Sequence, residues 1–125
     1  MTEVEYLDLD DLIVMIRAIG VGPVRDIGLL DSAVSRPRSS AFGEDAYPAM
    51  DLKAAALLDS LTNNHALVDG NKRLAWLASV VFCDLNALEP DLDDHVAFEL
   101  VWAVASTRME VAEIAQGLHL VATRS

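Results

Sequence analysis

The segment from His65 to Arg73 (HALVDGNKR) combines several groups that act together in phosphate chemistry. An apolar helix is expected to begin near Asn71, directly after Gly70, and its first turn holds Lys72 and Arg73. The first N–H groups of a helix lack intrahelical partners and the helix dipole is positive there, so a helix start can bind an anion. Gly70 lets a phosphate approach the backbone, and the two cations can grip its oxygens. Because cations are unfavourable in a first helical turn, their position indicates a bound anion.

Two further side chains of this segment could supply a base and a metal ligand. His65 can take a proton near neutral pH, and Asp69 offers the hard oxygen that Mg²⁺ prefers. Together with the anion site, these groups meet the needs of phosphoryl or nucleotidyl transfer. The Walker-loop pattern is absent. Ordinary cap and turn chemistry is the alternative interpretation, and spacing alone does not decide between the two.

Helical periodicity runs through the rest of the chain, and no segment shows sustained alternation. The predicted fold class is therefore all-α: a compact bundle of about six helices in one domain, residues 1–125, with the motif loop leading into a central buried helix. The predicted helices cover residues 9–19, 28–35, 50–64, 71–85, a segment from 91–94 to 104, and 111–116, with Gly117 as the last stop.

Three features outside the motif lead to separate expectations. The polar, turn-rich stretch 38–47 could form a small hairpin and serve as a flap that docks a target peptide. Trp76 and Trp102, at helical spacing, are expected in the core and not as a platform for stacking bases. Cys83, within an apolar helix, is expected to be an inert buried thiol.

The composition excludes several classes of protein. The chain carries 9 Lys and Arg against 20 Asp and Glu, a formal net charge of −11. Nucleic-acid binders need a basic surface, so no direct nucleic-acid binding is expected. The longest apolar run, Leu74 to Cys83, is shorter than the roughly 20 residues that span a bilayer, so no membrane association is expected. With a single cysteine and an acidic N-terminus unlike a signal peptide, the chain is expected to be cytoplasmic.

The motif resembles the signature of the Fic/Doc superfamily, His-x-Phe-x-(Asp/Glu)-(Gly/Ala)-Asn-(Gly/Lys)-Arg. This chain matches it from His65 to Arg73, except that Leu67 replaces the usual Phe. The upstream stretch 25–33, followed by Arg36-Pro37, Phe42-Gly43 and Tyr47-Pro48, is similar to the Doc (death-on-curing) branch. The resemblance covers nearly the whole chain and implies the Fic/Doc fold.

The eighth motif position indicates which group is transferred. Fic enzymes, which transfer AMP to a protein hydroxyl, usually have a second Gly there, whereas Doc toxins have Lys, as does this chain with Lys72. The resemblance thus implies a toxin of a toxin–antitoxin pair that uses ATP and Mg²⁺ to phosphorylate a threonine of translation elongation factor Tu, which arrests translation.

The resemblance also implies a role for each motif residue. His65 is the expected base, and Asp69 the ligand of Mg²⁺. Gly70 and Asn71 form the nest for the phosphates, with help from the Asn71 side chain. Lys72 and Arg73 neutralise the phosphates and the transition state. The expected catalytic residues are therefore His65, Asp69, Lys72 and Arg73, and the expected phosphate-binding residues are Gly70, Asn71, Lys72 and Arg73.

Two alternatives remain open at this point. The protein could be a Fic-like adenylyltransferase, or an inactive Fic-fold binding module if Leu67 disturbs the loop. Residues 106–110 match only the first part of the self-inhibitory motif of Fic proteins, since Val111 follows Glu110. Control by a separate antitoxin, whose disordered tail folds into a groove near the active site, is therefore expected.

Overall fold

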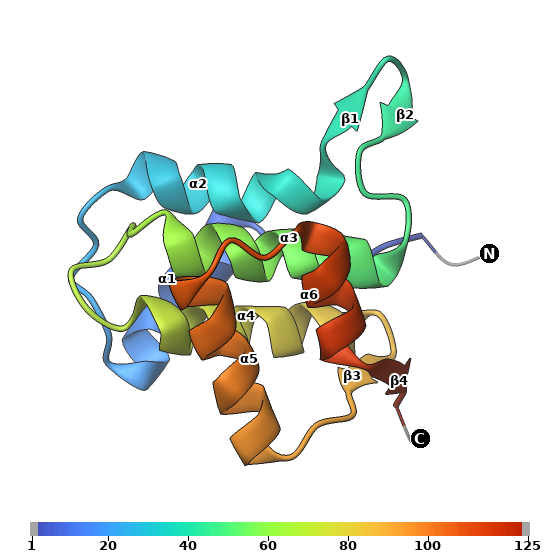
Figure 1. The fold of residues 1–125 in the computed structure, drawn as a ribbon. Coiled ribbons are helices and arrows are strands. Elements are labelled where there is room, and N and C mark those ends of the chain that lie inside the picture. Colours follow the sequence, from blue (N-terminus) through green and yellow to red (C-terminus); the bar gives the residue numbers. More distant parts are fainter. Residues whose placement is uncertain (1–2, 124–125) are drawn as a thin grey trace.

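Two long helices pack against each other at the centre of the structure and four shorter helices surround them (Figure 1). The computed structural model describes residues 3–123. Its α-helices over those residues are α1 (Leu9–Ile19), α2 (Ile27–Ser35), α3 (Met50–Asn63), α4 (Asn71–Leu85), α5 (Asp94–Ser106) and α6 (Val111–Leu118). The all-α bundle is thus confirmed, with α3 and α4 as its central pair.

Side-chain caps explain where several of these helices begin. The Asp8 carboxylate accepts a hydrogen bond from the Asp11 N–H at 2.9 Å, and Asp11 returns the bond to the Asp8 N–H. This reciprocal capping box satisfies two of the N–H groups that a helix start leaves open. The Asp93 carboxylate accepts a hydrogen bond from the Val96 N–H and caps the start of α5. Gly20 ends α1 in the left-handed conformation, which glycine adopts readily.

The core lies between α3 and α4 because both helices present small and aliphatic residues to each other. Ala54, Ala55, Ala75 and Ala78 are fully buried, so the two backbones approach closely. Leucines of both helices and Phe82 fill the space around this contact. One face of helix α4 is therefore buried in the core, and the first turn of the helix is held at a defined place.

Two short antiparallel strand pairs accompany the helices. The first joins β1 (Ser40–Ala41) to β2 (Glu44–Asp45), and the second joins β3 (Leu88–Pro90) to β4 (Leu120–Ala122).

The prediction that α6 stops at Gly117 is wrong, because His119 in the left-handed conformation is the cap. A Cβ at Gly117 would lie 2.8 Å from Leu100 Cδ1, so this glycine serves close packing against α5.

The β1–β2 hairpin forms within residues 38–47, which confirms the expected small hairpin, and its docking of a target peptide stays a prediction. It lies beside the start of α3, where the buried Lys53 ammonium contacts Asp45 Oδ2 at 3.3 Å and the Pro37 carbonyl (Figure 1). The motif loop leaves the other end of α3, which is about 20 Å away for a helix of this length.

None of the helices described for residues 3–123 combines the length and the apolar character that a membrane span needs.

Candidate active site

The motif loop between α3 and α4 is held by the segment that joins α1 to α2. Val24 and Leu67 form an isolated antiparallel bridge. On one side of it the Val68 N–H donates to the Pro23 carbonyl at 3.0 Å, and the Gly22 N–H donates to the Asp69 carbonyl at 2.9 Å. These backbone bonds link residues 22–24 to 67–69, so a distant part of the chain sets the path of the motif loop.

The Asn71 side chain closes the same loop from the helix side. Its Oδ1 accepts from the Leu67 N–H at 3.0 Å, and its Nδ2 donates to the Leu67 carbonyl at 2.9 Å. Both polar atoms of the amide are therefore engaged by the loop, and the part of Asn71 that remains for an anion is its backbone N–H. The Leu67 side chain is 2% exposed and belongs to the core, so it anchors the loop as the usual Phe is expected to do.

His65 lies at the start of the loop in a defined backbone conformation. Its φ of 56° is left-handed, and the Arg25 guanidinium donates two hydrogen bonds to its carbonyl oxygen. No hydrogen bond joins the His65 ring to another residue within 3–123, and the residue is exposed. The backbone of His65 is thus held while its ring stays free to bind a substrate. Sequence reasoning missed this role of Arg25, although Arg25 belongs to the stretch that resembles Doc.

Where α4 begins, the backbone conformation and the neighbouring Val21 both disfavour any residue larger than Gly70. Its φ is 92°, and a Cβ would lie 2.4 Å from Val21 Cγ1 and 2.5 Å from Val21 Cβ. Gly70 is also the N-cap of α4 and supplies no side-chain cap. Among residues 3–123, nothing accepts a hydrogen bond from the backbone N–H groups of Asn71, Lys72 and Arg73. The start of α4 is therefore open to an anionic ligand.

The two cations of the first turn have no carboxylate within ion-pairing distance in residues 3–123, although the chain is strongly acidic. The Lys72 Nζ instead lies 4.9 Å from the centroid of the Trp102 ring. This contact is a cation–π interaction, which leaves the ammonium with its charge uncompensated. Trp102 is 47% exposed, so its expected place in the core is wrong, whereas Trp76 is partly buried.

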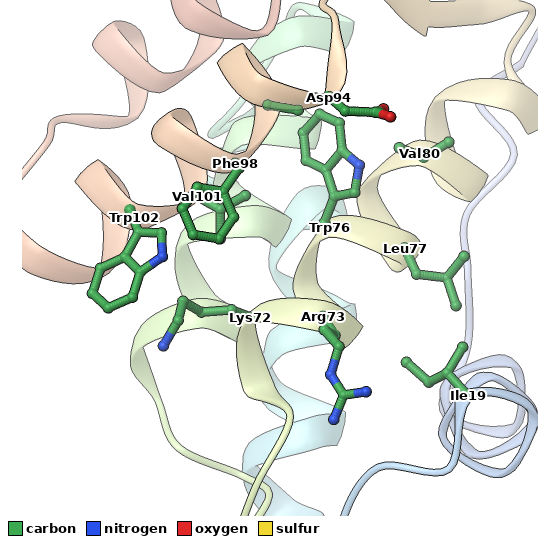
Figure 2. Close-up of a pocket in the computed structure, with 11 residues that line it drawn as sticks. Ile19, Lys72, Arg73, Trp76, Leu77, Val80, Asp94, Phe98, Val101 and Trp102 are labelled. Carbon is green, nitrogen blue, oxygen red and sulfur yellow. The ribbon is translucent and has the colours of Figure 1, made fainter.

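These groups surround one cavity of about 350 Å³. Its lining includes the motif residues His65, Asp69, Gly70, Asn71 and Lys72 together with Thr62, Trp102 and Ser106. Arg73 does not line it and faces the neighbouring groove beside Ile19 (Figure 2). The structure therefore brings most of the predicted site residues together around this cavity, whereas Arg73 lies in the neighbouring groove.

Thr62 is a member of this cavity that sequence reasoning missed. It is 3% exposed, and its Oγ1 has no hydrogen-bond partner within the described residues. A buried hydroxyl without a hydrogen-bond partner is costly in a folded protein. The sequence offers one sign of this position: Thr62 lies three residues before His65, in the last turn of α3, directly before the motif loop.

The donor set fits a magnesium ion that a nucleotide brings with it. Over residues 3–123, no group of three or more His, Cys, Asp or Glu side chains could hold a metal by itself. Asp69 is exposed and lines the cavity beside the open start of α4. Since Mg²⁺ commonly takes one or two carboxylates and completes its shell with phosphate oxygens and water, one carboxylate at this place suffices.

Comparison with known proteins agrees with this geometry. The model of the Fic/DOC family matches residues 2–83, which include the motif loop, the segment that holds it and almost all of α4. The chain is 47% identical over 118 residues to the protein named Toxin Doc from Mycolicibacterium smegmatis, with 91% of each chain covered. The match to the family model over residues 2–83 and the 47% identity over most of both chains place this chain in the Fic/DOC family.

Proposed function

We propose that this protein is the toxin of a toxin–antitoxin pair and acts in the cytoplasm as an ATP-dependent protein kinase, with a threonine of elongation factor Tu as its target. The observation that carries the proposal is one cavity that joins a free His65 ring, the Asp69 carboxylate and the uncapped start of α4. Family membership and the 47% identity to a protein named Toxin Doc support it.

The reaction assigns one task to each group. The His65 ring takes the proton of the target hydroxyl, whose oxygen then bonds to the γ-phosphorus as the bond to the β-phosphate oxygen breaks and ADP leaves. The N–H groups of residues 71–73, with Lys72 and Arg73, neutralise the phosphate oxygens. Asp69 holds the Mg²⁺ that the nucleotide carries, and the ion supplies further charge neutralisation.

Adenylyl transfer is the second candidate, and Gly70 is the observation that favours it. Gly70 is the residue that Fic-type enzymes have at this position. Lys72 favours the kinase, because its side chain fills the place of the second Fic glycine. An inactive binding module has less support, since Leu67 is buried and the loop is held by several hydrogen bonds.

Intact mass of purified elongation factor Tu after incubation with this protein, ATP and Mg²⁺ tests the proposal. We expect a gain of one phosphate, with the rate reduced on the order of 10²–10⁴-fold in His65→Ala. His95→Ala is the matched control, since His95 is also exposed and its ring lies within ion-pairing distance of Glu99 on α5. A gain of one AMP would establish the adenylyltransferase instead.

The antitoxin can be tested with the same assay. A cognate antitoxin with a disordered tail should inhibit the transfer and bind near the motif. Adding the purified antitoxin in equimolar amount should abolish modification of the target, and removal of its tail should restore it. Modification that continues in the presence of the whole antitoxin would contradict this part of the proposal.

A further inference from the structure

A second cavity, of about 510 Å³, adjoins the motif cavity at the end of α3. Its wall consists of the connection between α5 and α6 and of Asp59 and Asn63 on α3. Asn63, Ala105 and Ser106 line both cavities, so the two share a wall. In Figure 1 the connection runs from α5 to α6 alongside α3. A ligand that places one group next to His65 can therefore continue along this connection.

The connection is extended and held at both ends. Thr107 has a φ of −127° and a ψ of 165°, and Glu110 has a φ of −72° and a ψ of 151°. The Thr107 N–H donates to the Ala103 carbonyl at 2.9 Å, and the Glu110 N–H donates to Glu113 Oε1 at 3.0 Å. The two helices that the connection joins thus fix its ends.

Backbone groups in the middle of the connection have no hydrogen-bond partner among residues 3–123. They are the N–H groups of Arg108 and Met109 and the carbonyl oxygens of Thr107 and Arg108. Thr107 and Arg108 are exposed and Met109 is half-buried, so another chain can reach these groups. An extended backbone with open donors and acceptors is a template for pairing with a second strand.

The place of this open edge favours a segment of the protein substrate as its occupant. The substrate must bring a hydroxyl to the His65 ring, and the connection borders the cavity that this residue lines. A strand advances about 3.3 Å per residue, so a few residues of an extended peptide reach from one cavity into the other. The β1–β2 hairpin also has open edges, but it lies at the other end of α3.

We propose that residues 107–109 pair, as an edge strand, with an extended segment of the protein substrate whose acceptor hydroxyl enters the motif cavity. The proposal rests on the proposed function, because it assigns a docking surface to the protein that is modified there. Main-chain hydrogen bonds supply the affinity in this mode of recognition, and pockets for alternate side chains supply the specificity. Since the ends of the connection are held before the substrate arrives, pairing costs less entropy than it would in a mobile loop.

Amide hydrogen exchange, resolved by residue, tests the pairing directly. The free protein is compared with a complex of unmodified elongation factor Tu and the His65→Ala variant, which leaves the acceptor hydroxyl intact. Successive N–H groups of a strand point to opposite edges. We therefore expect one of the Arg108 and Met109 amides to become protected in the complex and the other to change little. The amides of residues 40–45 report on the hairpin in the same experiment.

Steady-state kinetics of proline variants measures what the pairing contributes. Arg108→Pro and Met109→Pro each remove one N–H, and Thr107 already has the extended backbone that a residue before proline requires. The proline at the protected position should raise the KM for elongation factor Tu by about three- to tenfold, the effect of one lost hydrogen bond. The KM for ATP should change by less than about twofold, since the motif residues are untouched.

Alanine at the same position separates the N–H from the side chain. Arg108→Ala and Met109→Ala keep the N–H, so each should raise the KM for elongation factor Tu less than the matching proline does. Circular dichroism shows whether each variant is folded, and the exchange experiment does not depend on any of these four substitutions.

Two results would overturn the docking surface alone. One is unchanged exchange at both amides in a complex that forms, with wild-type KM values in the folded proline variants. The other is protection of residues 40–45 instead, together with a raised KM in Phe42→Ala, which would place docking on the hairpin.

The proposed function and the docking surface can fail separately. Protection at the connection without modification of elongation factor Tu by the wild type would contradict the proposed function and support the docking surface. The absence of any complex between elongation factor Tu and the folded protein would overturn both.

Discussion

At the residue scale, Gly70 combines two constraints that can be separated by experiment. It has a left-handed φ of 92°, and its α-carbon lies so close to Val21 that a Cβ would clash. Gly70→Ala should therefore reduce the free energy of unfolding by the cost of the left-handed conformation, about 1 kcal/mol, and by a further 1–3 kcal/mol, roughly, for the displaced contact. Urea denaturation followed by circular dichroism measures the sum.

Gly43→Ala is the control for this prediction, because it places alanine in a left-handed conformation without a clash at its Cβ. Gly43 has a φ of 79°, and nothing lies within 4 Å of the Cβ that the substitution would add. Its loss of stability should be about 1 kcal/mol. Equal losses in the two variants would show that Val21 moves aside freely and that the close approach at Gly70 does not constrain the start of α4.

At the scale of elements, the start of α4 and the motif loop form one unit through Asn71. The Leu67 N–H has Asn71 Oδ1 as its acceptor, whereas the neighbouring Val68 N–H donates to the Pro23 carbonyl. Asn71→Ala should remove the protection of the Leu67 amide against hydrogen exchange and leave that of Val68 largely unchanged. It should also lower the rate of target modification, since the loop carries His65.

Amide exchange resolved by nuclear magnetic resonance measures both positions in one experiment. Loss of protection at Leu67 and Val68 together would contradict the expectation, since it would mean that the α1–α2 segment does not hold the loop without Asn71. Ser79→Ala is a suitable control on the same helix, because its hydroxyl bonds to the Ala75 carbonyl and does not contact the loop.

The elements that could be predicted from the sequence are those with a local signal. Apolar spacing was enough to predict α1 over residues 9–19, and the buried face of α4 followed from the residues of that helix alone. The β3–β4 pair has only three residues in each strand, too short for alternation to be visible. Whether a glycine stops a helix depends on its neighbours in space, so Gly117 gave the wrong end for α6.

The candidate site shows the same division between local and distant information. The motif residues carry types and spacing that indicate phosphate chemistry, and the structure gathers most of them around one cavity. The contact between Arg25 and His65 joins residues far apart in the chain, and the exposure of Trp102 depends on how α5 lies against α4. No single sequence pattern contains either relation, because both are set by tertiary packing.

At the scale of the whole molecule, Cys83 reports whether the core opens. The residue is fully buried in the core around α4, and burial raises the pKa of its thiol from 9.0 to about 12. At pH 8 the native thiolate fraction is then about one in 10⁴, and the sulfur is also covered. A thiol reagent should react with the native protein only through unfolding, and at once in concentrated guanidinium chloride.

The same shift makes the stability of the whole fold depend on pH in the alkaline range. Because the unfolded thiol ionises near pH 9 while the native thiol stays protonated, its stabilising contribution is complete below pH 9 and is lost as the pH rises toward 12. The loss approaches about 1.4 kcal/mol per pH unit in this range. Cys83→Ala removes this titration, so its stability should fall less steeply between pH 9 and 11 than that of the wild type. Parallel curves in urea denaturation would mean that the core around α4 admits water and that the thiol ionises in the native state.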